Sequence, residues 1–507
     1  MASRRIQVHS DPRDDKGVDA GELDAAFAAV RAELKVPDEF PPEVLAEAER
    51  VASAPDLPDR DETGLAFFTV DPPGSKDLDQ AMHLERTGDG YRVRYAIADV
   101  PAFVTPGGAI DEEARRRGQT IYSPDQRNPL HPASLSEGAA SLLPGQVRPA
   151  YLWDLTLDAD GEVTAAEVYR AMVRSRDRLD YDQVQEAVDG RRDDGRLLLL
   201  KEVGERRIAL ERGRGGASLP MPEQEVTLTD GGRYVVGFRP LAPAEDWNAQ
   251  ISLMTGIAAA EMMLHGEVGI LRTMPAADRD TIARFRRQAR ALGVEWPAEM
   301  LYGEFLRSLD RSNGKHLALI HDATTLFRGA GYTPFDGAVP EQTEHAAVAA
   351  PYAHVTAPLR RLVDRFGLVV CEALCTDSTV PEWAVQALPT LPEIMQATDQ
   401  LANAVDRACT DTVEAAALKD RVGEEFDAVV VDQRGEGESL VQVTDPAILA
   451  KCDGEAQLGA AVRVRLVEAE VADHSVRFAV TGGAAGSANG GQVLPAPAAA
   501  PGGHDGA

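Results

Sequence analysis

The feature that most constrains this chain is a group of acidic residues directly after a short apolar segment. FFTV (67–70) is followed by Asp71, a Pro-Pro-Gly turn, and then Asp77 and Asp79. Like charges crowded in this way repel one another unless a positive charge lies among them. If the chain after the turn is extended, Asp77 and Asp79 share one side and Leu78 points into the core. The pattern predicts a strand, a turn and a carboxylate cluster beside them.

Carboxylates gathered on one side are the ligands that Mg²⁺ prefers, and Mg²⁺ keeps several waters when it binds them. A cation held in this way can polarise a phosphate and stabilise the attacking and leaving oxygens of a displacement. The spacing alone leaves a second interpretation open, in which the aspartates belong to a solvated polar turn.

The overall charge does not by itself indicate a nucleic-acid partner. The 507 residues include 82 acidic and 52 basic side chains, which gives a net charge of −30. Proteins that bind nucleic acid usually show the opposite balance, because neutralising phosphates supplies much of their affinity. Local field matters more than the total, however, and RNA is not excluded. The arginine-rich helical cluster at 284–290 is interpreted as a solvated, salt-bridged surface.

Composition and the N-terminal sequence favour a cytoplasmic protein, expected to be a monomer. No stretch offers about twenty uninterrupted apolar residues, so no membrane span is expected. The first residues lack the apolar core of a secretion signal. Four cysteines in so long a chain favour a reducing compartment. Cys371 and Cys375 are expected to be core thiols, because no further ligands follow at zinc-site spacing.

A chain of this length is expected to form more than one domain. Apolar residues at helical spacing predict a short helical N-terminal region over 1–60. Strand patterns up to about residue 173 and helical periodicity beyond 247 predict an α+β domain over 61–420, with mixed sheets surrounded by helices. Short strands predict an OB-like barrel over 421–482. The small residues of 483–507 predict a disordered tail.

The acidic segment belongs to a longer run of motifs. TVDPPGSKDLDQAM resembles the signature of the ribonuclease II (RNB) family of processive 3′-to-5′ exoribonucleases. YAIADVPAFVTPGGAIDEEARRRGQTIY, NPLHPASLSEGAASLLPGQVRPA and PYAHVTAPLRRLVDRFG resemble later blocks of that family, in the same order. The resemblance implies an RNB-type catalytic domain that hydrolyses single-stranded RNA to nucleoside 5′-monophosphates. It also implies Mg²⁺, with Mn²⁺ as an alternative, and an RNA-binding role for the barrel.

The resemblance assigns roles to residues of the acidic signature and of the arginine motif. Three aspartates fall on the metal-site positions: Asp71, Asp77 and Asp79. Asp79 and Arg360 fall on catalytic positions, and Arg361 is expected to act beside them and to bind phosphate. A guanidinium suits this role because it stabilises charge on the scissile phosphate without risk of deprotonation. The alternative for Arg360 is a surface ion pair with Asp364.

Three further residues receive RNA-related roles by resemblance. Tyr181 matches a tyrosine that stacks near the last nucleotide, and Tyr122 matches an aromatic that holds the RNA 3′ end. Each would otherwise be interpreted as core packing. Asp406 is a candidate for an acidic residue near the product.

The sequence departs from the family pattern at several places, two of which affect the expected chemistry of the site. Gln80 replaces the last aspartate of the acidic signature, and its amide oxygen could still ligate but brings no charge. If Gln80 is a ligand, Gln80→Asp should lower the Mg²⁺ concentration needed for half activity. A helix starting at Gln80 would bring His83 one turn further on, where imidazole would favour Mn²⁺ or Zn²⁺. Ile251 and Ser252 stand where the family has acidic residues, which predicts relaxed discrimination of RNA from DNA through the 2′-OH.

Two other functions remain open on sequence grounds. Gln80 favours a catalytically weakened or inactive RNB-like protein that binds RNA as a regulator. The retained aspartates and arginines oppose it, because a scaffold has little reason to keep so many charges together. The acidic composition also fits a metal phosphoesterase acting on small molecules, which the length of the resemblance opposes.

Overall fold

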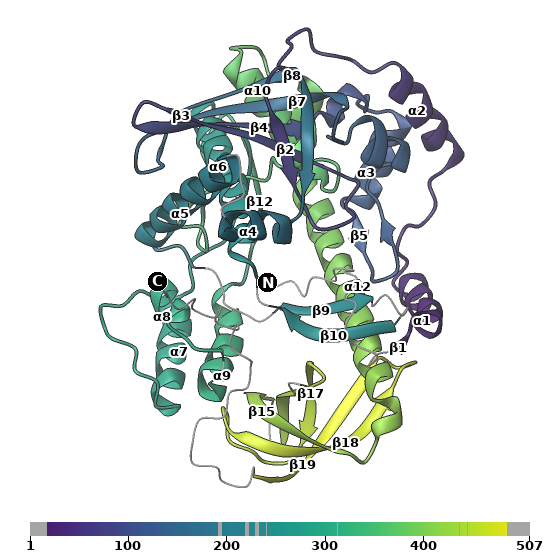
Figure 1. Ribbon diagram of the computed structural model, residues 1–507, viewed down its shortest axis with the longest axis vertical. Helices are drawn as coiled ribbons and strands as arrows, with labels where there is room; N and C mark the ends of the chain where they lie inside the picture. The colour runs from purple at the N-terminus through teal and green to yellow at the C-terminus, as the bar shows by residue number, and fades with distance from the viewer. Residues whose placement is uncertain are drawn as a thin grey trace, which may run out of the picture.

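Two closed β-barrels lie at opposite ends of the molecule, with helices around and between them (Figure 1). The computed structural model describes residues 18–190, 195–217, 223–228, 233–239, 241–311, 313–434, 437–443 and 445–483. The long helix α12 (Leu391–Leu418) extends from the first barrel towards the second. The combination of mixed sheets, helices and a small C-terminal barrel confirms the α+β prediction.

The N-terminal region is helical, as its apolar spacing predicts. After the short β1 (Val18–Asp19) come α1 (Ala20–Glu33) and α2 (Pro42–Ser53). Leu23 and Phe27 of α1 are fully buried in a cluster that also contains residues of α12. The N-terminal helix is therefore packed onto the long helix.

The first barrel carries the acidic segment at one of its strand ends. Its strands are β2 (Phe67–Val70), β3 (Gln80–Thr87), β4 (Gly90–Ala98), β7 (Val147–Leu157) and β8 (Val163–Leu179). Neighbouring strands pair antiparallel except β2 and β8, whose parallel pairing closes the barrel. Aromatic and β-branched residues of these strands, such as Phe68, Tyr95 and Trp153, are fully buried, which suits a pleated core surface.

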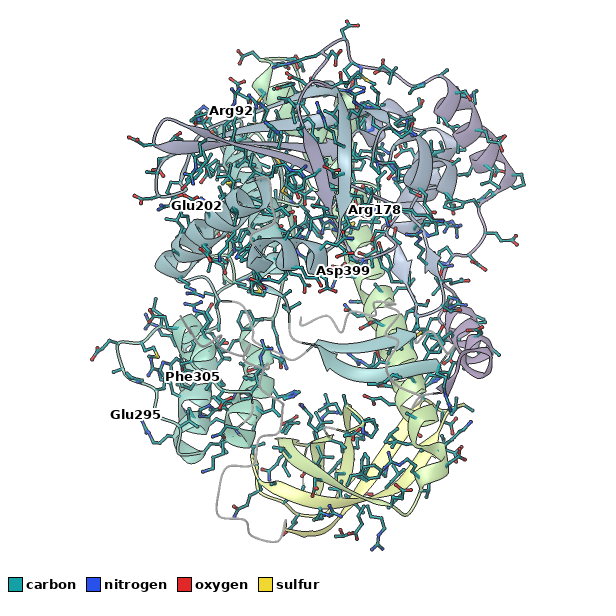
Figure 2. All side chains as sticks on the ribbon, in the orientation of Figure 1. Arg92, Arg178, Glu202, Glu295, Phe305 and Asp399 are labelled. Carbon is teal, nitrogen blue, oxygen red and sulfur yellow. The ribbon has the colours of Figure 1, made fainter. Side chains whose placement is uncertain are left out.

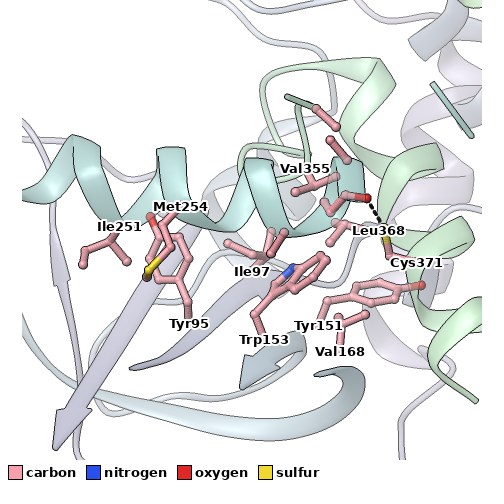
Figure 3. Packing of buried hydrophobic residues seen from close by; sticks show 14 of the residues in the cluster. Tyr95, Ile97, Tyr151, Trp153, Val168, Ile251, Met254, Val355, Leu368 and Cys371 are labelled. Carbon is pink, nitrogen blue, oxygen red and sulfur yellow. Dashed lines mark hydrogen bonds between the residues drawn. The ribbon is translucent and has the colours of Figure 1, made fainter. Parts of the chain in front are cut away.

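The barrel core continues onto two helices, α6 (Pro243–His265) and α10 (Leu362–Cys375). Figure 3 shows Tyr95, Trp153 and Met254 in this core. Cys371 is fully buried, and the Sγ of Cys375 lies 3.5 Å from the Sδ of Met262. Cys371 is a core thiol, as the sequence predicts, and Cys375 is partly buried and packs against the same core.

The remaining elements connect the two barrels or cover the first. Between β4 and β7 lie η1 (Val100–Ala102), α3 (Ala109–Arg117), β5 (Ile121–Tyr122), β6 (Arg127–Asn128) and η2 (Leu135–Ala139). After β8 come α4 (Tyr181–Gly190), α5 (Arg196–Arg214), β9 (Glu223–Leu228) and β10 (Arg233–Arg239), then, beyond α6, β11 (Val268–Thr273), α7 (Arg279–Ala291), α8 (Tyr302–Arg307), α9 (Gly314–Asp322), η3 (Ala323–Leu326), β12 (Gly331–Asp336), β13 (Glu344–His345) and β14 (Ala350–Pro351). Helices α11 (Glu382–Ala387) and η4 (Leu388–Thr390) precede α12, and η5 (Lys419–Arg421) follows it.

The C-terminal barrel confirms the OB-like prediction. It contains β15 (Glu425–Gln433), β16 (Glu438–Val443), β17 (Ile448–Asp453), β18 (Ala461–Glu470) and β19 (Ser475–Gly483), in the order β15-β16-β17-β19-β18. Phe426 and Phe478 pack edge to face in its core, with ring centroids 5.6 Å apart. The predicted disordered tail lies outside the described residues, apart from Gly483.

Within the part of the chain that the structure describes, no helix is long and apolar enough to cross a lipid bilayer.

Candidate active site

The loop between β2 and β3 holds the acidic residues against the rest of the protein. The backbone N–H of Asp71 donates to the carbonyl of Leu179, at the end of β8 (3.1 Å). Leu78 is fully buried, and its N–H donates to the Oγ of Ser141 (2.9 Å). Leu78 therefore occupies the core as predicted, and it fixes the two aspartates on either side of it.

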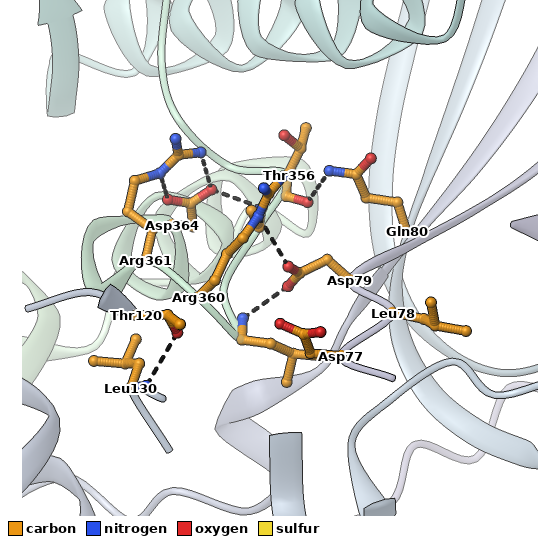
Figure 4. Close-up of polar contacts among 12 residues, drawn as sticks. Asp77, Leu78, Asp79, Gln80, Thr120, Leu130, Thr356, Arg360, Arg361 and Asp364 are labelled. Atoms are coloured by element: carbon orange, nitrogen blue, oxygen red, sulfur yellow. Dashed lines mark hydrogen bonds and ion pairs between the residues drawn. The ribbon is translucent and has the colours of Figure 1, made fainter. Parts of the chain in front are cut away.

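Asp79 is tied to the segment that carries the arginine pair (Figure 4). Its Oδ1 accepts a hydrogen bond from the backbone N–H of Leu359 (2.7 Å), and its Oδ2 lies 3.3 Å from the Nε of Arg360. Burial raises the pKa of Asp79 well above its ordinary value, while Arg360 and the Leu359 N–H act in the opposite direction. The Arg360 side chain is 47% exposed, so it can still reach a substrate phosphate.

Asp71 presents an unsatisfied carboxylate oxygen. Its Oδ2 is buried and has no hydrogen-bond partner. Burial raises the pKa of Asp71 to about 6; Arg360 lowers it, and Asp77 raises it further. An unpaired buried oxygen of this kind is costly unless a donor or a cation meets it. Asp71 is therefore the position that most needs a positive partner.

Asp77 already has such a partner, which the sequence analysis did not identify. Its Oδ1 accepts from Nη1 of Arg127 in β6 (2.7 Å), and Nη2 of Arg127 lies 2.9 Å from Glu137. The hydroxyl of Tyr122 in β5 is 3.4 Å from the other oxygen of Asp77. Arg127 immediately precedes the NPLHP motif, so proximity to a motif was the only sequence signal for it.

The donor set fits a hard divalent cation bound through Asp71 and Asp79. In the described ranges, no group of three or more His, Cys, Asp or Glu side chains is gathered closely enough to hold a metal. Mg²⁺ needs no complete protein cage, since one or two carboxylates, waters and substrate phosphates commonly hold it. The unsatisfied Oδ2 of Asp71 is the observation that supports the fit.

Gln80, like Asp79, contacts the segment that leads into Arg360. Both the nitrogen and the oxygen of its amide form hydrogen bonds. Its Nε2 donates to the carbonyl of Thr356 (2.7 Å), and its Oε1 accepts from the hydroxyl of Tyr95 (2.5 Å). Ser252 lies within the same network, 2.7 Å from the Tyr95 hydroxyl. Ile251, the other departure from the family pattern, is fully buried in the core.

The prediction that His83 lies one helical turn beyond Gln80 is wrong. Gln80 begins strand β3, so residues 80 and 83 point to opposite faces of the sheet. The Nδ1 of His83 lies 3.3 Å from the carbonyl of Ala66, and its ring packs edge on against Phe67. His83 is therefore removed from the candidate metal ligands.

Arg361, and not Arg360, forms the ion pair with Asp364. Its Nε and Nη2 donate to the two oxygens of Asp364, at 2.5 and 2.8 Å, and Asp364 also accepts from the N–H of Ala357 (2.8 Å). Asp364 is fully buried and thus holds both the guanidinium and the turn that precedes it. Of the two arginines, Arg360 is the one that faces the carboxylates.

Of the two predicted RNA-contacting aromatics, Tyr122 lies beside a carboxylate and Tyr181 lies just beyond the end of β8. Tyr122 is 41% exposed beside Asp77. Tyr181 begins α4, two residues after the β8 residue that binds the backbone of Asp71. Burial raises the pKa of Tyr95, and Tyr181 acts in the same direction.

The structure connects Asp399, two turns before Asp406 on α12, to the arginine segment. Asp399 accepts from the side chain of Gln119 (3.1 Å) and lies 3.5 Å from a guanidinium nitrogen of Arg272. The backbone of Gln119 forms a β-bridge with Arg361. In Figure 2, Asp399 is labelled near the middle of the molecule. Burial raises the pKa of Cys409, and the charge of Asp406, three residues earlier on α12, acts in the same direction.

Comparisons with known proteins agree with this architecture. Residues 60–373 match the family described as RNB domain, and residues 424–481 match the RNase II-type exonuclease C-terminal S1 domain. The chain is 25% identical over 448 residues to Ribonuclease R 1 of Lactococcus lactis, covering 82% of this chain and 52% of the relative. It is 28% identical over 336 residues to the probable exosome complex exonuclease RRP44 of Caenorhabditis elegans, covering 61% and 34%. The chain thus spans about half of the first relative and a third of the second.

Two solved structures show the same fold. The apo form of Mycoplasma genitalium RNase R superposes with a TM-score of 0.79 at 18% identity, covering 90% of this chain and 77% of that one. Yeast Ssd1, described as a pseudonuclease, superposes with a TM-score of 0.65 at 17% identity, covering 87% and 57%. The family match extends over more than half of the chain and includes the whole Asp71–Arg360 constellation. This protein belongs to the RNB family.

Proposed function

We propose that this protein is a divalent-metal-dependent exoribonuclease. It degrades single-stranded RNA processively from the 3′ end and releases nucleoside 5′-monophosphates. The observation that carries the proposal is the juxtaposition of the unsatisfied Asp71 carboxylate, the buried Asp79 carboxylate and the half-exposed Arg360. We assign catalysis to residues 61–420 and a supporting role to the barrel at 421–482.

The residues of the site divide the work of phosphodiester hydrolysis among them. A divalent cation, when bound, would polarise the phosphate and lower the pKa of a water molecule. Asp71 and Asp79 would hold this cation, with Mg²⁺ suited to their oxygens and Mn²⁺ as the alternative. Arg360 is placed to stabilise charge that develops on the scissile phosphate. Tyr122 and Tyr181 can stack on bases at the 3′ end, a contact that tolerates any sequence.

The test uses full-length protein and a 5′-labelled single-stranded RNA, with Mg²⁺ or with EDTA. The proposal expects shortening from the 3′ end with Mg²⁺ only, and nucleoside 5′-monophosphates as products. Persistent intermediates at every length would contradict processivity, and shortening in EDTA would contradict metal dependence.

A second candidate is an RNB-like protein that binds RNA without cleaving it. Arg127 favours it, because this arginine already neutralises Asp77 and thereby removes one carboxylate from the cation site. RNA binding without shortening, at every Mg²⁺ and Mn²⁺ concentration, would support this candidate over the enzyme.

A further inference from the structure

Two departures from the family pattern that are far apart in the sequence meet in one hydrogen-bond network. Gln80 lies at the start of β3 and Ser252 lies in α6. The hydroxyl of Tyr95, from β4, is 2.5 Å from the Oε1 of Gln80 and 2.7 Å from the Oγ of Ser252. The Oγ of Ser252 is also 3.4 Å from the Oε1 of Gln80. Gln80 and Ser252 are neutral, although the family pattern has acidic residues at both positions.

The Thr356 carbonyl, at one end of the network, fixes the direction of each hydrogen bond. The carbonyl of Thr356 can only accept, so the amide nitrogen of Gln80 must face it (2.7 Å). The Oε1 of Gln80 therefore faces Tyr95 and accepts the phenol proton. The hydroxyl of Ser252 then donates to the Tyr95 oxygen. Donors run from Ser252 through Tyr95 and Gln80 to Thr356.

This series of hydrogen bonds ends at Thr356, in the turn that carries Arg360. Three contacts hold the turn: Gln80 binds the carbonyl of Thr356, Asp364 binds the N–H of Ala357, and Asp79 binds the N–H of Leu359 (Figure 4). Two of these anchors accept from backbone N–H groups, and carboxylates can do this. The third contact requires a donor, because its backbone partner is a carbonyl oxygen. An ionised aspartate at position 80 has no proton to donate there.

We propose that Gln80 is a positioning residue that fixes the Thr356–Arg361 turn and is not a metal ligand. Its amide nitrogen has no free lone pair, and its oxygen already accepts from Tyr95. Tyr95 is fully buried and orients the amide, and Ser252 leaves the phenol proton to Gln80. An acid at position 252 would compete for that proton. The neutral residues at 80 and 252 therefore act together to hold the Thr356–Arg361 turn.

The inference rests on the proposed function, because the turn matters for catalysis through Arg360. If Arg360 is displaced, the rate falls while RNA binding by the rest of the site persists. A shift of about 1 Å in a catalytic group can cost on the order of a hundredfold in rate. A missing metal ligand would instead weaken Mg²⁺ binding, and added Mg²⁺ would restore the rate.

The decisive variants are Gln80→Ala and Gln80→Asp, with Tyr95→Phe as a milder probe. The matched control is Gln386→Ala, on the exposed surface of α11, where the amide donates to Glu382 (2.7 Å). The measurements are kcat and KM on single-stranded RNA, calorimetric affinity for Mg²⁺ alone, and hydrogen exchange of residues 353–361.

We expect Gln80→Ala to lower kcat about tenfold to a hundredfold. KM and the affinity for Mg²⁺ should stay within a factor of about three of the wild type, and the turn should exchange faster than in Gln386→Ala. Gln80→Asp should also lose kcat at saturating Mg²⁺, whereas the ligand hypothesis expects a lower Mg²⁺ requirement and a retained or increased kcat. Tyr95→Phe should fall between Gln80→Ala and the wild type.

Two results would overturn the inference: rescue of Gln80→Ala by high Mg²⁺, or unchanged exchange of the turn in that variant. Absence of RNA hydrolysis by the wild-type protein would refute the proposed function instead. Hydrogen exchange would still decide whether Gln80 holds the turn.

Discussion

At the scale of single residues, the site depends on how much a buried carboxylate costs when nothing neutralises it. Asp71 and Asp79 both have raised pKa values because they are buried, yet their surroundings differ. Asp79 has a backbone donor and Arg360, whereas one oxygen of Asp71 has no partner within the described part of the chain. The protein thus orients Asp79 with its own donors and leaves one oxygen of Asp71 for a cation that the two carboxylates would share.

This difference predicts a pH dependence for metal binding. The pKa of Asp71 is raised to about 6, so this carboxyl is protonated below that pH and must lose its proton to bind a cation. Mg²⁺ affinity measured by calorimetry should therefore fall about tenfold per pH unit below 6. Asp71→Asn should bind Mg²⁺ more weakly with a flatter profile, and a flat wild-type profile would contradict the role.

A second residue-scale prediction concerns Arg360. Arg360→Lys keeps the positive charge but loses the planar fork that pairs with phosphate oxygens. We expect kcat to fall about a hundredfold to a thousandfold, the range seen when one transition-state donor is removed, with little change in KM. Arg434→Lys, on the exposed side of the second barrel, is the control. An Arg360→Lys enzyme with wild-type kcat would show that charge alone suffices.

Linear motifs allowed Asp71, Asp79 and Arg360 to be predicted, because each lies within a recognisable run of residues. Tyr95 could not be distinguished from ordinary core residues, since its strand alternates as any buried strand does. His83 was misplaced because QAMHLE fits a strand and a helix almost equally well when read alone. Contacts such as Gln80 to Thr356 join residues far apart in the chain, and only the assembled fold shows them.

At the scale of elements, the position of the arginine turn depends on how closely α6 approaches the chain that leads into it. A Cβ placed at Gly256 would lie 2.5 Å from the carbonyl oxygen of Ala353 and 2.2 Å from the ring of Tyr352. The N–H of Ala353 also donates to the carbonyl of Gly256 (3.0 Å). The helix and the extended segment are thus in backbone contact, with no room for a side chain.

We therefore expect Gly256→Ala to destabilise the fold by about 1–3 kcal/mol, the usual cost of overpacking a close contact. Because the displaced segment continues into Thr356, kcat should fall more than KM changes. Gly64→Ala is the control, since an added Cβ there meets no atom within 4 Å. Chemical denaturation and steady-state kinetics measure the two effects. Wild-type values for Gly256→Ala would show that the contact can relax freely.

At the scale of the whole molecule, the question is where a chain of net charge −30 attracts an anionic substrate. Every described arginine and lysine between 425 and 483 lies within 4.0 Å of an acidic side chain: Arg434, Lys451, Arg463, Arg465 and Arg477. The two aromatic residues of that region, Phe426 and Phe478, are buried in the barrel core. The barrel therefore offers RNA no cation free of an acidic partner and no stacking surface within its described part, whereas Tyr122 on β5 is 41% exposed beside Asp77.

This distribution predicts that RNA affinity and its salt dependence arise mainly in the RNB domain. The double variant Arg463→Gln/Arg465→Gln removes two positive charges from the barrel, but both are already neutralised by Asp427 and Glu425. Its dissociation constant for a single-stranded RNA, measured by fluorescence anisotropy in EDTA at several salt concentrations, should differ from the wild type by less than about twofold. For every phosphate that the variant ceased to neutralise, the slope of log K against log salt would become shallower by about 0.7, and we expect no such change. A tenfold weaker affinity with a reduced slope would show that RNA displaces the ion pairs and binds the barrel. That outcome would return the RNA-binding role to the C-terminal domain.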